Sequence, residues 1–576
     1  MKQNYAWGGN MNTKKEKKKM SIDFKFVLLA VTIIIIFCAI ISPITLQNDT
    51  YYTIKIGDDI INNYGVDMQD HYSWHDNLPY YYPHWLYDVI IYLIFSLGGM
   101  KGIYISTVVL ACILGTLIFF LNCKLSKNKL TSFFITLGMM YLLKDFIAAR
   151  AQLVTYIMFI LEIWCIEAFL DTKKTRYMIS LVGIAIIIAN VHSAVWPLFF
   201  VFFLPYIVSY LWTYLVSANL WYRMQIQCNN FIIKLCKNSK KNKKDKIEKC
   251  NSNIEELKNR INIANEKRNK RNENPYRIQM ERNKNIKWLI FIAVICAFTG
   301  LLTPIGDMPY TYLTRTLQGK TTTYISEHLP LTLADDKFTA CMLVMFLSII
   351  VFTDTKIKLR DLFMMSGLII LAFLSRRQTS MLVLVGGLIL NKLVATLFEK
   401  YDKDGSNKIL KQIVTPTGTI ISLLLLALIV ISQYKTKKND TFINESAYPV
   451  QAADYIIENL DVNNIRLYNE YNYGSYLLYR GIPVFIDSRA DLYSPEFNGQ
   501  KDNNGKYNGR DIFTDFMNIS NIGVYYEDKF EEYDITHLLM SKKSKLNMFI
   551  SRDSNYKEIY SDENFVLYAR LNVYEK

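Results

Sequence analysis

The sequence predicts an α-helical polytopic membrane protein with a C-terminal extracytoplasmic α/β domain. Of its 576 residues, 51% are hydrophobic and 14% are aromatic, which is more than one water-soluble core of this length needs. Apolar runs that approach the ~20 residues needed to cross a bilayer recur along the chain. After residue 432 these runs stop, and the chain becomes polar and rich in tyrosine.

The apolar runs predict about eleven transmembrane helices. They define two transmembrane regions, 24–216 and 288–432, with an outer loop at 47–100. Residues 85–97 are also apolar, but this run is too short to cross and contains Asp88, so it is predicted to lie along the membrane surface. The predicted spans are residues 24–46, 102–121, 131–143, 151–170, 177–189, 194–216, 288–304, 338–352, 362–374, 381–397 and 415–431.

Basic residues give the predicted orientation in the cell membrane. The segment "KKEKKK", within the basic N-terminal region 1–23, precedes the first span without a signal-peptide cleavage site. With a cytoplasmic N-terminus, the loops that fall on the same side are all basic, and an odd number of spans places the C-terminal domain outside. The formal net charge of +15 then marks the cytoplasmic face, so no nucleic-acid partner is predicted.

Two segments outside the membrane have patterns of their own. The basic segment 217–287 is predicted to be a cytoplasmic helical insert that folds back on itself or self-associates, because its apolar residues follow a heptad spacing. In the C-terminal domain, 433–576, "YPVQAADYIIENL" has helical spacing, and "NIRLYNE", "IPVFID", "ITHLLM", "YKEIYS" and "NFVLYAR" are short β-rich runs. The heptad positions are Ile247, Cys250, Ile254, Leu257, Ile261 and Ala264.

Three pairs of spans must turn on the outer side of the membrane. A single helix over residues 362–397 would be ~54 Å long at 1.5 Å per residue, nearly twice the thickness of the hydrocarbon layer, so the chain is predicted to turn at "SRRQTS". The same argument predicts turns at "KDFIAARAQ" and "ANVHSA". The turns expose the polar residues Lys144, Arg150, His192, Arg376 and Arg377.

Outer arginines oppose the usual distribution of basic residues, so they need a reason. One reason is a negatively charged ligand at the membrane surface, because guanidinium groups bind phosphate through two parallel hydrogen bonds. The alternative is that they reach lipid phosphates or pair with acids of the C-terminal domain. Lys144, Arg150, Arg376 and Arg377 are therefore predicted to face one cavity and to bind the phosphate of a substrate.

The first outer loop and a block of the C-terminal domain resemble a known family. "NDTYYTIKIG" followed by "NLPYYYPHWLYDVIIYLIFSLGGMKGI" is similar to the first outer loop of GT-C glycosyltransferases, which include lipid A aminoarabinose transferases and protein O-mannosyltransferases. The block "LYNEYNYGSYLLYRGIPVFIDSRADLY" resembles a set of related bacterial membrane proteins. The sequence departs from these patterns at Thr53, His84 and Ser488, where the relatives tend to carry a His, an acid and a Gly. Roles tied to those three positions do not carry over.

The resemblance implies a GT-C-like fold. It also implies that Asp49 is the catalytic carboxylate that follows the first span. An alternative is that Asp49 ends that span and hydrogen-bonds the turn at Thr50 and Tyr51. His84, Trp85 and His192 are predicted substrate contacts. No cofactor is predicted, because the nine cysteines show no zinc-ligand spacing and the cluster Asp70, His71 and His75 is a weak metal signal; a divalent metal is left open.

The predicted function is transfer of a sugar from a polyprenyl-phosphate donor to an unknown acceptor in a bacterial cell envelope, either a surface polymer, a lipid or a protein. The other predicted partners are membrane lipids and, through the insert, a second copy. A non-catalytic scaffold for envelope polymers is the first alternative. A transporter ranks lower, because the predicted spans carry few charged residues.

Overall fold

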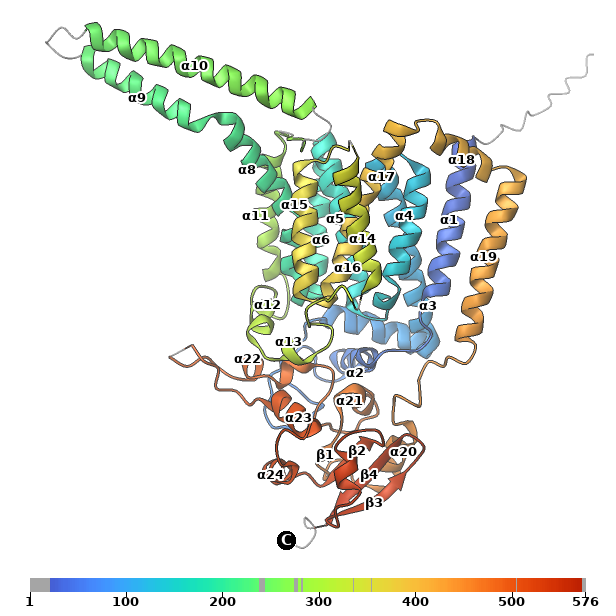
Figure 1. The fold of residues 1–576 in the computed structure, drawn as a ribbon. Coiled ribbons are helices and arrows are strands. Elements are labelled where there is room, and N and C mark those ends of the chain that lie inside the picture. Colours follow the sequence, from blue (N-terminus) through green and yellow to red (C-terminus); the bar gives the residue numbers. More distant parts are fainter. Residues whose placement is uncertain are drawn as a thin grey trace, which may run out of the picture.

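The computed structural model describes residues 21–237, 244–273, 278–280, 283–334, 336–353, 355–503 and 505–571. The "KKEKKK" segment and parts of the basic insert lie outside these residues. A bundle of helices occupies one end of the molecule, and the C-terminal domain covers the other (Figure 1). Between them lie the outer loop and the tips of the helical turns.

The bundle contains the apolar helices that the sequence predicts. Six are long and apolar enough to cross a membrane: Ile22–Ile41, Trp85–Ser126, Ala151–Thr172, Ser193–Leu215, Arg376–Tyr401 and Pro416–Lys437. Shorter apolar helices are Lys129–Leu142, Thr175–Val191, Ile286–Leu301 and Lys337–Phe352. The count of eleven spans and the assignment of the two faces stay predictions. The bundle elements are α1 (Ile22–Ile41), α3 (Trp85–Ser126), α4 (Lys129–Leu142), α5 (Ala151–Thr172), α6 (Thr175–Val191), α7 (Trp196–Val201), α8 (Leu204–Ala218), α11 (Ile286–Ala297), α14 (Lys337–Phe352), α15 (Leu359–Leu374), α16 (Thr379–Met381), α17 (Gly387–Tyr401), α18 (Gly405–Ile413) and α19 (Pro416–Lys437).

The three helix breaks predicted from length are present. Short 3-10 turns at Lys144–Phe146, Ser193–Val195 and Arg376–Gln378 separate the paired helices. A chain of this length cannot stay helical and remain within the bilayer, so polar residues collect where it turns. All three turns lie at the end of the bundle next to the C-terminal domain (Figure 1).

Helix α3 changes direction at Gly99, which has φ 57° and ψ −153°, a conformation that suits glycine. Its first part runs across the end of the bundle and its second part enters the bundle (Figure 1). Residues 85–97 thus have the arrangement that the sequence predicts for a surface segment. The first part packs on α2 (Asn48–Asn62), whose first turn contains Asp49.

Gly57 allows α2 and α3 to approach closely. A Cβ atom at position 57 would lie 2.1 Å from the carbonyl oxygen of Asp88. We expect Gly57→Ala to force the helices apart and to lower the free energy of unfolding by about 1–3 kcal/mol. The measurement is the thermal unfolding midpoint in detergent. Gly98→Ala is the matched control, because nothing lies within 4 Å of its Cβ position, and an equal loss in both variants would contradict the packing argument.

Charged side chains are buried inside the bundle. The transporter alternative was ranked low because the predicted spans carry few charged residues, and the structure shows more buried charge than that argument assumed. Glu167 of α5 accepts hydrogen bonds from Arg360 at 2.9 Å and from the Tyr206 hydroxyl at 2.8 Å. Lys392 of α17 pairs with Asp361 at 2.6 Å. Glu162, also in α5, is fully buried, and neither carboxylate oxygen has a hydrogen-bond partner among the described residues.

The basic insert forms a hairpin of α9 (Leu220–Lys237) and α10 (Lys244–Glu273). All six predicted heptad positions are buried or half-buried in α10, and α10 packs against α9. The insert therefore folds back on itself, which is one of the two predicted alternatives. Self-association stays a prediction, and the heptad face that suggested it is occupied within the chain.

The C-terminal domain has the predicted α/β composition. Its sheet has the order β1-β2-β4-β3, with β1 (Leu467–Tyr468) parallel to β2 (His537–Ser541) and the pairs β2–β4 (Phe565–Arg570) and β3 (Tyr556–Ser561)–β4 antiparallel. The run "IPVFID", which was predicted to be β-rich, is not a strand of this sheet. Its residue Val484 instead forms an isolated bridge with Ser73 of the outer loop. The helices around it are α20 (Val450–Asn459), α21 (Tyr471–Tyr479), α22 (Pro495–Asn498), α23 (Ile512–Ser520), α24 (Tyr526–Glu532) and α25 (Asn547–Ile550).

Candidate functional site

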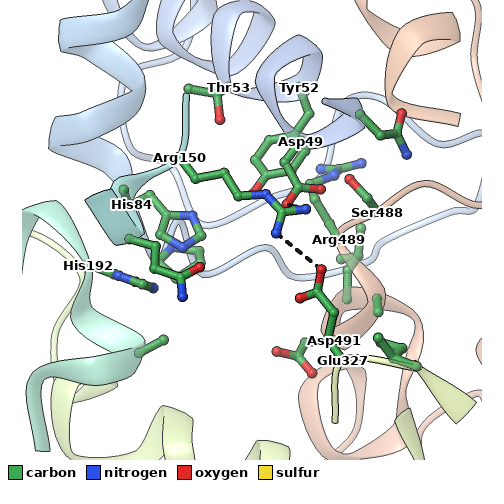
Figure 2. Close-up of a pocket in the computed structure, with 18 of the residues that line it drawn as sticks. Asp49, Tyr52, Thr53, His84, Arg150, His192, Glu327, Ser488, Arg489 and Asp491 are labelled. Atoms are coloured by element: carbon green, nitrogen blue, oxygen red, sulfur yellow. Dashed lines mark hydrogen bonds and ion pairs between the residues drawn. The ribbon is translucent and has the colours of Figure 1, made fainter. Parts of the chain in front are cut away.

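A cavity of about 370 Å³ lies where the outer loop, the helical turns and the C-terminal domain meet (Figure 2). We call it the main cavity. Helix α2 contributes Asp49, Tyr52 and Thr53 to its wall, and the turns of the bundle contribute Arg150, His192 and Arg377. The C-terminal domain closes it with Tyr471, Asn472 and residues 488–492.

Arg150 joins two acids inside the main cavity. Its guanidinium lies 2.8 Å from Asp49 Oδ2 and 3.4 Å from Glu327 Oε1, so it sits between the two carboxylates (Figure 2). Asp49 and Arg150 are each about one quarter exposed, whereas half of the Glu327 side chain is exposed. Asp49 lies in the first turn of α2 and does not end the first span, because α1 stops at Ile41.

Backbone hydrogen bonds fix Glu327 next to the arginine turn. The Arg377 N–H donates to the Glu327 carbonyl and the Arg376 N–H donates to the Leu329 carbonyl, both at 2.9 Å. Although burial alone would raise the pKa of Glu327, the guanidinium groups of Arg150 and Arg377 hold it below its ordinary value. Glu327 therefore carries a negative charge at neutral pH.

A second cavity of about 280 Å³ adjoins the main cavity, and we call it the basic cavity. The two share Arg150, Gln152, Ser326, Glu327 and Arg377 in their walls. Arg376 lines the basic cavity only, as do Gln47 and Asp145. Within the described residues the Arg377 guanidinium has no hydrogen-bond or ion-pair partner, so this cation is open to an anionic ligand.

The predicted phosphate-binding residues do not all meet. Arg150, Arg376 and Arg377 converge on the basic cavity, whereas Lys144 is absent from the lining of both cavities. The Lys144 ammonium instead lies 4.9 Å from the centre of the Tyr141 ring, in the preceding helix. The four residues thus share the end of the bundle next to the C-terminal domain but not one site.

The predicted substrate contacts divide in a similar way. His84 and His192 line the main cavity with their ring centres 4.9 Å apart. Trp85 is absent from the lining of both cavities, and its indole N–H donates to Asn190 at 3.2 Å. Trp85 therefore joins the start of α3 to the end of α6 in this structure.

Both cavity histidines are neutral at physiological pH. Burial and the charges of Arg377 and Arg150 lower the pKa of His84 to about 3. Burial lowers the pKa of His192 well below its ordinary value, and its Nδ1 lies 3.0 Å from the Thr155 hydroxyl. A neutral imidazole can donate or accept a hydrogen bond, so the pair suits contact with hydroxyl groups.

Glu327 and Asp491 line the cavity but were not predicted as site residues. Asp491 comes from the C-terminal domain and accepts hydrogen bonds from Thr316 at 3.3 Å and Thr321 at 3.5 Å, near α12 (Met308–Gln318) and α13 (Thr321–Tyr324). Burial raises its pKa above the ordinary value. In the sequence, Glu327 is an acidic residue in a loop between two predicted spans. No motif or residue spacing around it distinguishes it from other loop acids.

A buried ion network attaches the C-terminal domain to the outer loop. Arg489 lies 2.6 Å from Asp70 and 2.7 Å from Asp487, and both acids are fully buried. His75 and His71 point elsewhere, since His75 contacts the Phe485 carbonyl at 2.8 Å and His71 pairs with Asp67. No cluster of three metal-ligating side chains occurs in the described part of the chain, and all nine cysteines are free thiols.

We compared the chain with protein families, curated proteins and solved structures, and only the solved structures gave matches. No protein-family model matches the chain, and no curated protein matches it. The apo form of the Archaeoglobus fulgidus oligosaccharyltransferase is similar to it, with 12% identity over 91% of this chain and 70% of the other and a TM-score of 0.50.

Two further structures of that enzyme have similar scores. The form tethered to an acceptor peptide containing the NVT sequon has 10% identity, coverage of 95% and 74%, and a TM-score of 0.48. The complex of this enzyme, AglB, with an inhibitory peptide and a dolichol-phosphate has 11% identity, coverage of 96% and 75%, and a TM-score of 0.49. At 12% identity the apo form shows the fold alone: the chain shares the fold of this oligosaccharyltransferase, and the GT-C-like fold predicted from the outer loop is confirmed at that level.

Proposed function

We propose that this protein is a membrane glycosyltransferase that moves a sugar from a lipid-phosphate carrier, of the polyprenyl class, to an acceptor outside the cell membrane. The observation that carries the proposal is that a carboxylate, Asp49, lines one of two joined cavities and that Arg377, a cation without a side-chain partner among the described residues, lines both. Sugar transfer from a phosphate carrier needs both groups. The GT-C fold supports the proposal at the level of architecture.

Asp49 is the proposed base. Its Oδ2 is held by Arg150, which leaves Oδ1 without a hydrogen-bond partner among the described residues. In the proposed reaction the acceptor O–H gives its proton to Oδ1 while the acceptor oxygen attacks the anomeric carbon of the sugar. The bond from that carbon to the phosphate oxygen breaks, and the carrier leaves as a lipid phosphate.

The basic cavity is the proposed site of the carrier phosphate. The leaving phosphate gains negative charge as the bond breaks, and Arg377 and Arg376 would stabilise that charge in a partly enclosed site. Arg150 has a different proposed role, because its guanidinium pairs with the carboxylates of Asp49 and Glu327; it holds Asp49 in position. His84 and His192 would contact sugar hydroxyls from the wall of the main cavity.

Turnover of a lipid-linked sugar tests this proposal. Purified protein in proteoliposomes is supplied with a panel of radiolabelled polyprenyl-phosphate sugars and with a membrane extract as the source of acceptor. We expect consumption of at least one donor and release of polyprenyl phosphate. A protein that binds polyprenyl phosphate but consumes no donor in the panel would contradict transfer and favour the scaffold alternative.

Transport is less well supported by the cavity geometry. Glu162 is the buried carboxylate that a proton-coupled transporter would need, but it lines neither the main cavity nor the basic cavity. The paired charges of Glu167, Arg360, Asp361 and Lys392 also line neither cavity. The two cavities together thus contain the groups for transfer and lack those acids.

A further inference from the structure

Helix α9 has an exposed apolar face. Trp221 and Phe231 are 68% and 62% exposed, and Met224, Cys228 and Leu235 are exposed beside them. These positions are spaced by three, four, three and four residues, so they share one face of the helix. An apolar face of this length with two exposed aromatic rings indicates an interaction surface.

The opposite side of α9 is already occupied. Tyr222, Ile226, Asn229, Ile233 and Cys236 are buried or half-buried, and their spacing places them toward α10. Figure 1 shows that the hairpin leaves the bundle at the end opposite the C-terminal domain, with α9 on the side of α10 that faces the flank of the membrane helices. The exposed apolar face therefore belongs to the helix nearer the bilayer.

Charge distinguishes a lipid surface from an apolar protein partner. Helix α9 contains Arg223, Lys234 and Lys237 and no acidic residue, and all three are exposed. By helical spacing they lie on one flank of the apolar face. A helix with exposed aromatic and aliphatic residues on one face and basic residues beside it is typical of helices that lie in the headgroup layer of an anionic membrane.

The apolar face also follows on from a lipid-facing one. In α8 the exposed residues include Leu204, Val208, Leu211 and Leu215, again spaced by three and four. Asn219, with φ 47°, separates α8 from α9 and changes the direction of the helix where α8 reaches the end of the bundle. Trp221 comes two residues after this bend, where the chain leaves the bundle, and tryptophan is a residue type that prefers the membrane interface.

From these four observations we infer that α9 is an amphipathic membrane-surface helix, which binds the anionic headgroups of the leaflet at the end of the bundle opposite the C-terminal domain. Its apolar face enters the headgroup and acyl-chain boundary, and its basic flank contacts lipid phosphates. Helix α10 covers α9 from the aqueous side. The hairpin thereby fixes the bundle to one leaflet without a further membrane span.

Site-specific fluorescence in the full chain tests this inference. The exposed native thiols are first removed with Cys228→Ser and Cys341→Ser, and an environment-sensitive fluorophore is attached at Phe231→Cys. Its matched control is Asn230→Cys, the neighbouring exposed position on the basic flank. Each protein is placed in nanodiscs of phosphatidylcholine alone or of an equal mixture with phosphatidylglycerol, with spin-labelled lipids as quenchers.

We expect the probe at position 231 to shift to shorter wavelength and to be quenched by the spin-labelled lipids in the anionic nanodiscs, whereas the probe at position 230 stays accessible to an aqueous quencher. Arg223→Gln and Lys234→Gln should each lower the docked population about fivefold in the anionic nanodiscs. Equal aqueous quenching at both positions in every lipid would overturn the inference. A probe at position 231 that is shielded in detergent, together with dimers in solution, would overturn it in favour of a second copy.

Discussion

Replacing Asp49 by asparagine should lower the rate of sugar transfer about 10²- to 10⁴-fold, the range expected for removal of a general base. The amide keeps the shape of the carboxylate and most of its hydrogen bonding, but it cannot take a proton from the acceptor. The variant also loses the ion pair with Arg150, while its side-chain oxygen keeps its place beside the guanidinium. The measurement is the initial rate of transfer in proteoliposomes.

The matched control for this variant is Asp58→Asn in the same helix. Asp58 accepts a hydrogen bond from Asn62 and lines neither cavity, so its amide should leave the rate unchanged. Both proteins must show the wild-type unfolding midpoint, which separates catalysis from folding. Transfer by folded Asp49→Asn protein at the wild-type rate would make Asp49 a structural residue.

The sequence predicted that Asp49 lies just beyond the first span, because that position depends on one boundary only, and its catalytic role stays a prediction from the family resemblance. The first span was predicted to end near residue 46, with the polar residues that follow at the membrane surface, and in the structure α1 ends at Ile41. The arginine turns were found by the same kind of argument, since a helix of fixed rise must turn within a bilayer of fixed thickness. Constraints of this type come from the membrane and need no knowledge of tertiary contacts.

Contacts between distant segments were not predictable in this way. Glu327 meets Arg150 across 177 positions of sequence, through a loop without helical or strand periodicity. Arg489 of the C-terminal domain meets Asp70 of the outer loop in a similar manner. Asp487 and Arg489 of the same network are only two residues apart in the sequence, so that contact is local.

Lys144 marks another limit of the length argument. The argument gives the depth of a residue in the membrane, but not the direction of its side chain around the helix axis. The short 3-10 turn Lys144–Phe146 leaves the Lys144 ammonium over the Tyr141 ring, whereas Arg150, after the turn, points into the main cavity. The conformation of this short turn therefore determines which basic side chains line the cavities and which do not.

Arg377→Gln should lower kcat/KM for the lipid-linked donor about 10²- to 10³-fold, because a preorganised cation at the leaving phosphate is removed. Arg377 lines both cavities and has no hydrogen-bond or ion-pair partner within the described residues, so its loss breaks no contact that holds the fold. Arg377→Lys should recover part of the activity, since lysine keeps the charge but not the two parallel hydrogen bonds.

Lys144→Gln is the matched control for this series. It removes one positive charge from the same end of the bundle but at a side chain outside both cavities, and we expect wild-type kcat/KM. Competition by polyprenyl phosphate gives a second readout, because weaker inhibition of Arg377→Gln would assign the lost interaction to the carrier phosphate. Equal losses in Lys144→Gln and Arg377→Gln would mean that the general positive potential of this face, and not the basic cavity, attracts the donor. Only a loss confined to Arg377 assigns the departing phosphate to this side chain, and with it connects the basic cavity to the base at Asp49.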